Sequence, residues 1–327
     1  MDFEAARRAV AEHARVTPLL PAVELSERLG RPVWLKAECL QRTGSFKVRG
    51  AAARISALTP QERQRGIVTC SSGNHGRAVA FVAERLGVPA TVFVPEWVDA
   101  VKLEGIRSSG ARPELAGKTF DESEALARER ATTTGMTYIS AYDDAEVIAG
   151  QGTIAGEVLE QLGEVPSAVI VPLSGGGLVG GIAAAFAELL GSSAPRHIAV
   201  SAKNAAVMLA SVRAGRPVEI PEQETLANAL AGGIGLDNQH SFRLVQELVD
   251  EYATVGEADI AGAMCYAVER LRLVVEGGGA VGLAALLSGA WRPVGIADGP
   301  LVMVLSGGNV APDTLRRVLE GSATAAA

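Results

Sequence analysis

The sequence predicts an α/β protein whose twisted, mostly parallel sheets are flanked by helices. Short apolar runs rich in β-branched residues alternate with alanine-rich stretches of helical periodicity. Such alternation is typical of parallel strands joined by helices. Glycine clusters follow several of these runs, and 37 glycines with only 4% aromatic residues suit tight turns and closely packed helices.

The expected elements alternate along the chain. Strands are expected at residues 31–38, 66–70, 89–95, 136–140, 167–174, 197–202 and 301–308. Helices are expected within residues 1–20, 47–57, 71–87, 98–111, 152–162 and 178–190, where apolar side chains recur at helical spacing. A length of 327 residues allows two domains, but no change in composition marks a boundary.

Composition and charge exclude several classes of protein. The net charge is −7 with both signs interspersed, so no nucleic-acid partner is expected. Three scattered cysteines argue for a reducing compartment without a disulfide framework, and four histidines without HxxxH or HxH spacing predict no zinc site. No apolar run reaches membrane-span length, and the N-terminus lacks the apolar core of a signal peptide. We therefore expect no membrane partner and a cytoplasmic location.

Lys47 occupies an unusual position for its charge. The stretch QRTGSFKVRGAAARI (residues 41–55) has the pattern of a helix start, with Lys47 in the first turn. The first turn of a helix carries partial positive charge, which disfavours an ammonium group. A neutral amine avoids this penalty and is a nucleophile, so Lys47 is a candidate for covalent catalysis. The alternative is a side chain that simply reaches solvent.

Three glycine-rich loops follow expected strands: SGNHG at 72–76, SGGGLVGG at 174–181 and SGGN at 306–309. Ligands bind beyond the carboxyl ends of parallel strands, so the loops are expected to meet at one crevice. In the second loop, the backbone N–H groups from Ser174 to Leu178 form an anion cup suited to a phosphate. This loop also contains G-x-G-x-x-G, but Lys203 and Asn204 stand where a dinucleotide site requires an acid. A single phosphate is therefore the better expectation.

A nucleophilic lysine and a phosphate cup together predict a phosphorylated aldehyde as the ligand. Pyridoxal 5'-phosphate carries both groups, with an aldehyde for Lys47 and a phosphate for the second loop. Spacing alone does not distinguish this cofactor from another phosphorylated ligand.

Taken in order, these motifs resemble the fold-type II pyridoxal-phosphate enzymes, and within them the threonine dehydratase and serine racemase group. The resemblance runs from Thr17 to Val310 and rests on GSFKVRGA, SSGNHG, SGGGL and SGGN. It implies Lys47 as the Schiff-base lysine. The remaining cofactor contacts that it implies are Phe46 beside the ring, Asn74 at the 3' oxygen, Ser174, Gly175, Gly176, Gly177 and Leu178 at the phosphate, and Ser306 at the pyridine nitrogen.

The same resemblance implies the substrate contacts and the catalytic groups. Ser71, Ser72, Gly73 and His75 are expected to hold the substrate carboxylate. Lys47 is expected to remove the α-proton, and Ser72, on the opposite face, to deliver a proton that permits racemisation. The ordinary structural alternatives are Asn74 in a turn, Ser306 as a turn cap, and His75 as a structural hydrogen-bonding group that does not contact the substrate.

The resemblance also supplies an architecture. It implies a large cofactor-binding domain of residues 1–55 and 145–327, with a small mobile substrate domain of residues 56–144 inserted into it. Closure of the small domain over the substrate is expected to exclude water. Relatives of this group are often dimers, so a homodimer is expected.

Departures from the group pattern bear on the substrate. Ser201 and Val207 stand where serine racemase-like members carry metal-binding carboxylates, so no metal site is expected. The segments TLANALAGGIGLDNQHSF, SVRAGRPVE and VEGGGAVG look closer to the hydroxyectoine utilisation dehydratase branch. That branch places Gly232, Gly233 and Asp237 near the site, although Asp237 by its own position is expected to cap a helix.

The expected function is β-elimination from a β-hydroxy-α-amino acid, giving a 2-oxo acid and ammonia. The departures favour a bulky or unusual substrate, such as a phenylserine-like, hydroxyaspartate or hydroxyectoine-type compound, over plain threonine. The alternatives are an amino-acid racemase, a β-replacement synthase and a non-catalytic protein that binds a phosphorylated metabolite.

Overall fold

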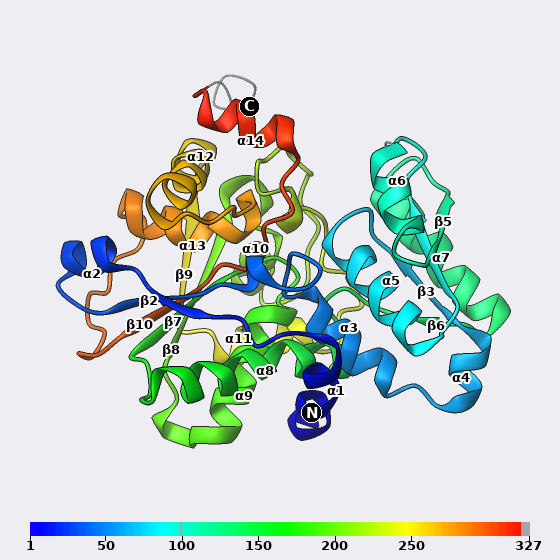
Figure 1. Cartoon of the computed structure of the whole chain (residues 1–327), viewed down its shortest axis with the longest axis horizontal. Coiled ribbons are helices and arrows are strands. Elements are labelled where there is room, and N and C mark those ends of the chain that lie inside the picture. Colours follow the sequence, from blue (N-terminus) through cyan, green and yellow to red (C-terminus); the bar gives the residue numbers. More distant parts are fainter. Residues whose placement is uncertain (99, 322–327) are drawn as a thin grey trace.

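A computed structural model of the chain describes residues 1–98 and 100–321, and these residues form two sheets that lie side by side in Figure 1. The large sheet has six strands in the order β1-β2-β10-β7-β8-β9, and the small sheet has four in the order β5-β4-β3-β6. Every strand pair is parallel except β1 and β2, which run antiparallel.

The large sheet is covered by helices on both faces. Its strands are β1 (Leu19–Pro21), β2 (Val33–Lys36), β7 (Ala168–Pro172), β8 (Arg196–Ala202), β9 (Glu251–Val255) and β10 (Leu301–Val304). One face carries α2 (Val23–Leu29), α12 (Glu257–Tyr266), α13 (Gly277–Ser288) and α14 (Pro312–Leu319). The other face carries α8 (Ala145–Leu162), α9 (Gly177–Leu190), α10 (Val207–Ala214) and α11 (Ser241–Leu248).

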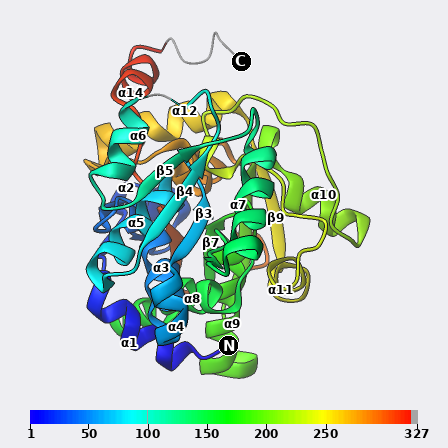
Figure 2. The ribbon, with the colours of Figure 1, turned by 90° about the vertical axis from the view of Figure 1, so that its right-hand side faces the viewer.

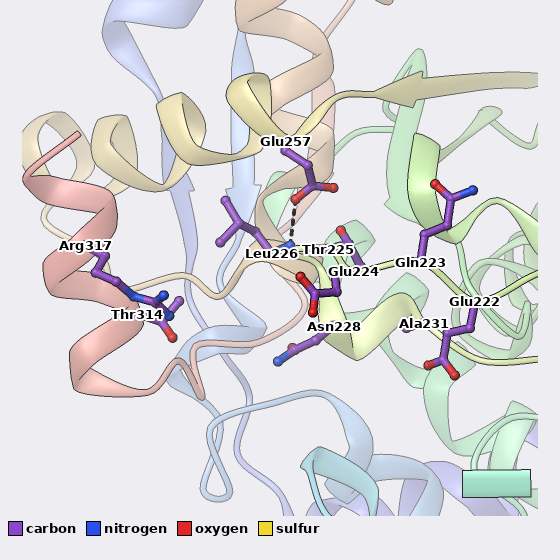
Figure 3. A pocket seen from close by; sticks show the side chains of 10 residues that line it. All are labelled: Glu222, Gln223, Glu224, Thr225, Leu226, Asn228, Ala231, Glu257, Thr314 and Arg317. Atoms are coloured by element: carbon purple, nitrogen blue, oxygen red, sulfur yellow. Dashed lines mark hydrogen bonds between the residues drawn. The ribbon is translucent and has the colours of Figure 1, made fainter. Parts of the chain in front are cut away.

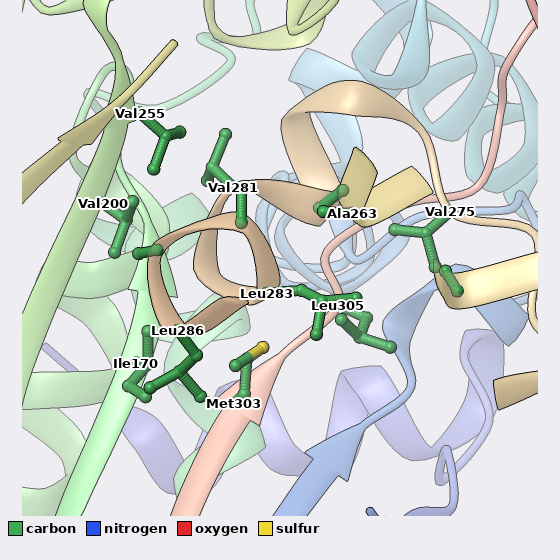
Figure 4. Close-up of a cluster of buried hydrophobic side chains, with 14 of the residues drawn as sticks. Ile170, Val200, Val255, Ala263, Val275, Val281, Leu283, Leu286, Met303 and Leu305 are labelled. Atoms are coloured by element: carbon green, nitrogen blue, oxygen red, sulfur yellow. The ribbon is translucent and has the colours of Figure 1, made fainter. Parts of the chain in front are cut away.

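Alternate strand residues enter opposite cores, as the pleat of a strand requires. Ile170 and Met303 pack under α13, where Figure 4 shows them with Leu286. Val169 and Val302, their neighbours in sequence, pack on the α8 and α9 side. Because both faces are buried, the strands read as continuous apolar runs.

The small sheet is likewise covered by helices on both faces. Its strands are β3 (Ile67–Cys70), β4 (Ala90–Val94), β5 (Arg112–Leu115) and β6 (Thr137–Tyr138). Figure 2 shows α5 (Asn74–Leu86) on one side of the sheet and α7 (Phe120–Thr134) on the other. Helix α6 (Ala100–Arg107) adds Leu103 and Ile106 to the core on the α5 side, whereas α4 (Pro60–Arg65) contributes no buried residue.

Helix α3 (Lys47–Ser56) lies between the two sheets (Figure 1) and shares a core with the small one. Its Val48 and Ile55 pack with Ile67 of β3 and Val147 of α8. Helix α1 (Phe3–His13) adds Val10 to the same cluster. The segment that begins at Lys47 is therefore fixed by packing from both sides.

The structure confirms the α/β class with mostly parallel sheets. All seven expected strands are present, and the helix expected at 47–57 ends at Ser56. The helix expected at 152–162 begins earlier, at Ala145, and the one expected at 98–111 is α6, with Asp99 outside the described residues. All four strands of the small sheet fall within residues 56–144, and movement of that segment stays a prediction.

Two expectations from composition concern cysteines and membranes. Cys39, Cys70 and Cys265 are all free thiols, and the first two are buried, in agreement with the expected lack of a disulfide framework. Within residues 1–98 and 100–321, none of the helices combines the length and apolarity needed to cross a bilayer.

Candidate active site

Lys47 is the first residue of α3, and no side chain caps this helix start. Its Nζ donates a hydrogen bond to Ala141 O at 2.6 Å and lies 5.1 Å from the centroid of the Phe46 ring. Burial lowers the pKa of Lys47 to about 8, and the charge of Glu276 opposes part of this shift. A substantial fraction of the amine is therefore neutral near that pH, as a nucleophile requires.

Asn74 begins α5 directly after the Ser71–Gly73 loop. Its Nδ2 donates to Glu276 Oε1 at 2.6 Å, and its Oδ1 accepts from Asn309 Nδ2 at 2.6 Å. Burial raises the pKa of Glu276, and the hydrogen bond from Asn74 opposes that rise. A primary amide has two N–H donors, so Asn74 has a second one for a ligand.

His75 is buried, and its Nε2 lies 3.1 Å from Ile139 O. Burial, followed by the charge of Lys47, lowers the pKa of His75 to about 3. The ring is therefore neutral and donates its Nε2–H to that carbonyl. An anion at the first turn of α5 would therefore meet backbone N–H groups and a neutral imidazole, and no imidazolium charge. Ser71 and Ser72 are half-buried beside this turn, and Gly73 is exposed.

The loop from Ser174 to Leu178 follows β7 and opens α9, which begins at Gly177. Gly176 adopts φ +83°, a left-handed conformation that favours glycine. A Cβ on Gly175 would overlap the Tyr142 ring, and one on Gly177 would lie 2.5 Å from Tyr142 O. The first intrahelical bond runs from Gly180 N to Gly176 O, so the earlier N–H groups of the helix point outward as an anion site.

Ser306 follows β10 and is held against the segment that precedes Lys47. Its carbonyl accepts a hydrogen bond from Phe46 N at 3.0 Å, and Ser45 pairs with Gly307 in an antiparallel bridge. The hydroxyl of Ser306 has no hydrogen-bond partner within the described residues. It is therefore available to a ligand beside Lys47.

The three expected loops are linked to one site through residues that sequence reasoning missed. Asn309 and Glu276 join the first and third loops through Asn74. Tyr142 lies against the second loop, next to the carbonyl of Ala141 that Lys47 contacts. Asn309 was within reach of sequence reasoning because it ends the SGGN motif, and Glu276 because it precedes the glycine run at 277–279. The pattern gives no signal for Tyr142.

Asp237 is expected from the sequence to cap a helix, and the structure shows that this is wrong. Helix α11 begins at Ser241, and Asp143 accepts hydrogen bonds from the backbone N–H groups of Gln239 (2.7 Å), His240 (2.8 Å) and Ser241 (2.9 Å). The cap comes from a segment far earlier in the chain, where a carboxylate suits the positive end of the helix.

The segment that contains Gly232, Gly233 and Asp237, which the branch resemblance places near the site, lies near Tyr142. Tyr142 Oη donates to Gly233 O at 3.4 Å, and Asp237 contributes to raising the pKa of Tyr142, after burial and the charge of Glu124. Gly232 stands beside Gly233, and a Cβ there would meet nothing within 4 Å.

A separate cavity of about 490 Å³ lies between the 222–231 segment, the start of α12 and α14 (Figure 3). Glu257 accepts a hydrogen bond there from Leu226 N at 2.6 Å. Its lining residues are Glu222, Gln223, Glu224, Thr225, Leu226, Asn228, Ala231, Glu257, Thr314 and Arg317. None of the expected site residues lines it.

The positions discussed for a metal carry other contacts. Ser201 is buried and donates to Leu173 O at 2.6 Å, and Val207 is buried at the start of α10. Within the described part of the chain, no three His, Cys, Asp or Glu side chains are grouped so that they could hold a metal ion.

Comparison with known families decides the class of protein. The chain matches the family described as "Pyridoxal-phosphate dependent enzyme" over residues 10–307. The chain belongs to this family.

The residues of this pyridoxal-phosphate dependent enzyme fit its cofactor. Lys47 offers a half-buried amine of lowered pKa, and the glycine loop forms a cradle that a Cβ on Gly175 would fill. The N-terminus of α9 suits a phosphate, and the free hydroxyl of Ser306 suits a ring nitrogen. The particular role of each residue stays a prediction.

Individual members of the family are similar over almost the whole chain. An L-threonine ammonia-lyase of Geobacter sulfurreducens is 41% identical, covering 96% of this chain and 76% of its own length. The structure of maize serine racemase superposes with a TM-score of 0.88 at 32% identity, covering 98% of this chain and 96% of the other. Processed threonine deaminase isoform 2 from Solanum lycopersicum gives a TM-score of 0.88 at 33% identity, covering 97% and 86%. This pyridoxal-phosphate dependent enzyme is thus threonine dehydratase- and serine racemase-like.

Proposed function

We propose that this enzyme is a lyase that eliminates the β-hydroxyl of an α-amino acid and releases a 2-oxo acid and ammonia. The observation that carries the proposal is the Lys47 amine, whose pKa of about 8 makes it available as a base beside the first turn of α5. Its similarity to a protein named L-threonine ammonia-lyase supports the same reaction.

Residues of this chain account for each requirement of that reaction. Bound pyridoxal phosphate withdraws electron density from the substrate α-carbon. The N-terminus of α9 holds the phosphate, the first turn of α5 holds the substrate carboxylate, and the Asn74 amide holds the 3' oxygen. Lys47 Nζ then takes the α-proton. The β-carbon–oxygen bond breaks, the departing hydroxyl takes the proton that Lys47 removed and leaves as water, and hydrolysis of the remaining enamine yields the 2-oxo acid and ammonia.

We further propose a substrate larger than threonine, of the kind used in the hydroxyectoine utilisation dehydratase branch. The proposal is supported by the resemblance to that branch and by the 232–235 segment, which borders Tyr142 through the hydrogen bond from Tyr142 Oη to Gly233 O. A phenylserine-like, hydroxyaspartate or hydroxyectoine-type side chain is the expected class.

Racemisation is the second candidate function. The hydroxyl of Ser72 is half-buried and has no hydrogen-bond partner within the described residues, so it is free to deliver a proton to the substrate. Maize serine racemase is among the similar structures. A β-replacement synthase would instead incorporate an added thiol without net release of ammonia.

Three organisational expectations remain proposals. We expect residues 56–144 to close over the substrate, the chain to form a homodimer, and the protein to reside in the cytoplasm. Slower hydrogen exchange across residues 71–77 on substrate addition would support closure, and unchanged exchange there would argue against it.

The test is turnover of a panel of β-hydroxy amino acids, followed by ammonia and 2-oxo acid release. The panel contains L-serine, L-threonine, threo-3-hydroxyaspartate, threo-phenylserine and hydroxyectoine. Lys47→Ala is expected to abolish turnover, and Lys203→Ala, at an exposed position, is the matched control. Chiral chromatography of the remaining amino acid detects racemisation in the same samples.

The outcomes separate the candidate functions. Release that is lost only in Lys47→Ala supports β-elimination, and the preferred side chain identifies the substrate class. If no ammonia or 2-oxo acid is released, inversion of the amino acid would indicate a racemase, and incorporation of an added thiol would indicate a β-replacement synthase. A bound chromophore that neither reacts nor changes with any amino acid would indicate a non-catalytic binder.

A further inference from the structure

We propose that Asn309 is a positioning residue that orients the Asn74 amide and ties α5 of the small sheet to the segment preceding Lys47. This inference rests on the proposed contact between Asn74 and the cofactor. The side-chain hydrogen-bond partners of Asn309 are Asn74, Thr43 and Arg77, and Asn309 is proposed to act through the bond to Asn74.

The Asn309 amide uses all of its donors inside the protein. Its Nδ2 donates to Asn74 Oδ1 at 2.6 Å and to Thr43 O at 2.8 Å. Its Oδ1 accepts a hydrogen bond from Arg77 Nη1 at 3.2 Å. Because Arg77 can only donate and the Thr43 carbonyl can only accept, these two partners determine which end of the amide is nitrogen.

Space for this amide is reserved by the backbone opposite it. Gly44 adopts φ +76°, and a Cβ at that position would overlap the Asn309 side chain. The carbonyl of Gly44 accepts from Gly308 N at 2.9 Å, so the 43–45 and 306–309 segments are joined by backbone bonds as well. The side chain therefore occupies a defined position close to the start of α3.

Two contacts fix the orientation of the Asn74 amide. Asn309 donates to its oxygen, and Glu276 accepts one of its two N–H groups. An amide group is planar, so these contacts also set the direction of the second N–H, the donor left for the cofactor. Loss of Asn309 leaves Glu276 as the single contact, which still faces the nitrogen of the amide but no longer fixes its plane, so the second N–H loses its direction.

The contacts also connect the two parts of the chain. Asn74 and Arg77 belong to α5, whereas Thr43, Glu276 and Asn309 precede or follow elements of the large sheet and α3. If α5 moves away, Asn74 loses Glu276 and Asn309 together. Asn309 therefore couples the position of the small sheet to the donor that Asn74 presents.

The experiment measures cofactor binding by absorbance, which needs no turnover. The variants are Asn309→Ala, Asn309→Asp, Asn74→Ala and the double variant Asn74→Ala/Asn309→Ala, with Asn228→Ala as a matched control at an exposed position. We expect Asn309→Ala to raise the cofactor Kd about three- to tenfold, as loss of one neutral hydrogen bond does, and to shift the absorbance maximum of the bound cofactor. We expect the double variant to bind no more weakly than Asn74→Ala, because Asn309 acts through Asn74.

Two results would overturn the proposal. One is an Asn309→Ala protein whose Kd and absorbance match the wild type. The other is a double variant whose loss equals the sum of the single losses. Asn309→Asp keeps the size of the side chain but removes both donors, so it tests the same point if the alanine variant does not fold. Absence of turnover on the amino-acid panel would contradict the proposed reaction, but the cofactor Kd and absorbance of the variants would still test the role of Asn309.

Discussion

A lysine in the first turn of a helix is unfavourable as an ammonium, and Lys47 shows how this site accommodates it. The first turn of α3 carries no acidic side chain, and burial lowers the pKa of the amine to about 8. Glu276, contributed by the start of a distant helix, is the charge that opposes the shift. The reactivity of Lys47 therefore depends on a buried carboxylate that the lysine motif does not contain.

This dependence predicts how the cofactor-free protein takes up pyridoxal phosphate as pH changes. Only the neutral amine attacks an aldehyde, so the uptake rate is expected to rise with pH around a midpoint of about 8, well below the ordinary lysine pKa of 10.5. Glu276→Gln removes the charge that stabilises the ammonium and keeps an acceptor for Asn74, so its midpoint is expected to fall further. Stopped-flow absorbance measures both.

Two observations would contradict this explanation of Lys47. The first is a midpoint near 10.5, which would mean that the amine is effectively solvated. The second is an unchanged midpoint in Glu276→Gln, which would mean that the charge of Glu276 does not influence the pKa of Lys47. Glu219→Gln, at an exposed position, controls for a change in net charge.

Among the elements, α3, α8 and α9 approach one another closely because glycines face each contact. A Cβ on Gly150 of α8 would lie 2.5 Å from Arg49 O of α3. A Cβ on Gly152 would lie 2.6 Å from Gly181 O of α9, and one on Gly181 would overlap Ile148 O. These approaches place the starts of α3 and α9, and hence the amine and the phosphate cradle, on one rigid group of helices.

Substitution at these contacts is expected to destabilise the fold. Gly181→Ala forces a methyl group into the Ile148 carbonyl, and we expect a loss of about 1–3 kcal/mol in the free energy of unfolding. Gly156→Ala, in the same α8 helix but with nothing within 4 Å of the new Cβ, is expected to gain about 0.5–1 kcal/mol. Urea denaturation of both variants measures the difference, and equal effects would show that the close approach does not limit stability.

The sequence predicts the central strands of both sheets, but of the edge strands it predicts only β6, and it misses the buried helix α13. Each expected strand lies in a sheet, whereas the three strands that the pattern missed, β1, β5 and β9, all lie at sheet edges. An edge strand such as β5 (Arg112–Leu115) is partly exposed and carries no apolar run, so periodicity gives no signal. Contacts between residues that are far apart in the sequence also leave no local pattern. Asp143 at the start of α11 and Glu276 beside Asn74 are examples, and both contacts follow from the fold.

At the scale of the whole molecule, a buried group of charged residues joins the first strands to α3 and α8. The Arg49 guanidinium contacts both oxygens of Glu38, at 2.8 Å each, and Glu157, at 2.6 and 2.8 Å. Lys36 Nζ contacts Glu157 Oε2 at 2.6 Å and Thr17 O at 2.7 Å. Two positive side chains (Lys36 and Arg49) thus pair with two negative ones (Glu38 and Glu157) inside the protein. Of these four residues, Arg49 lies two positions after Lys47 in α3.

Glu38 is the fully buried carboxylate of this group. Burial alone would raise its pKa, but the Arg49 guanidinium and the Thr17 hydroxyl outweigh burial and hold the pKa below its ordinary value of 4.5. A carboxyl group with a lowered pKa in the folded state stabilises the fold at pH values above 4.5, and this contribution is lost as pH falls through the lower, folded-state pKa.

Glu38→Gln is therefore expected to be costly at neutral pH and less so in acid. Removing one partner of a buried ion pair costs about 3–5 kcal/mol, since Arg49 keeps its charge without full compensation. Below the ordinary glutamate pKa the wild type loses the stabilisation that Glu38 provides, while the glutamine variant has no carboxyl group there to protonate. The gap between the two unfolding free energies should narrow as pH falls from neutral to acid, and urea denaturation at several pH values measures it. A gap that stays constant with pH would mean that the loss comes from altered packing around Arg49 and not from its charge pair.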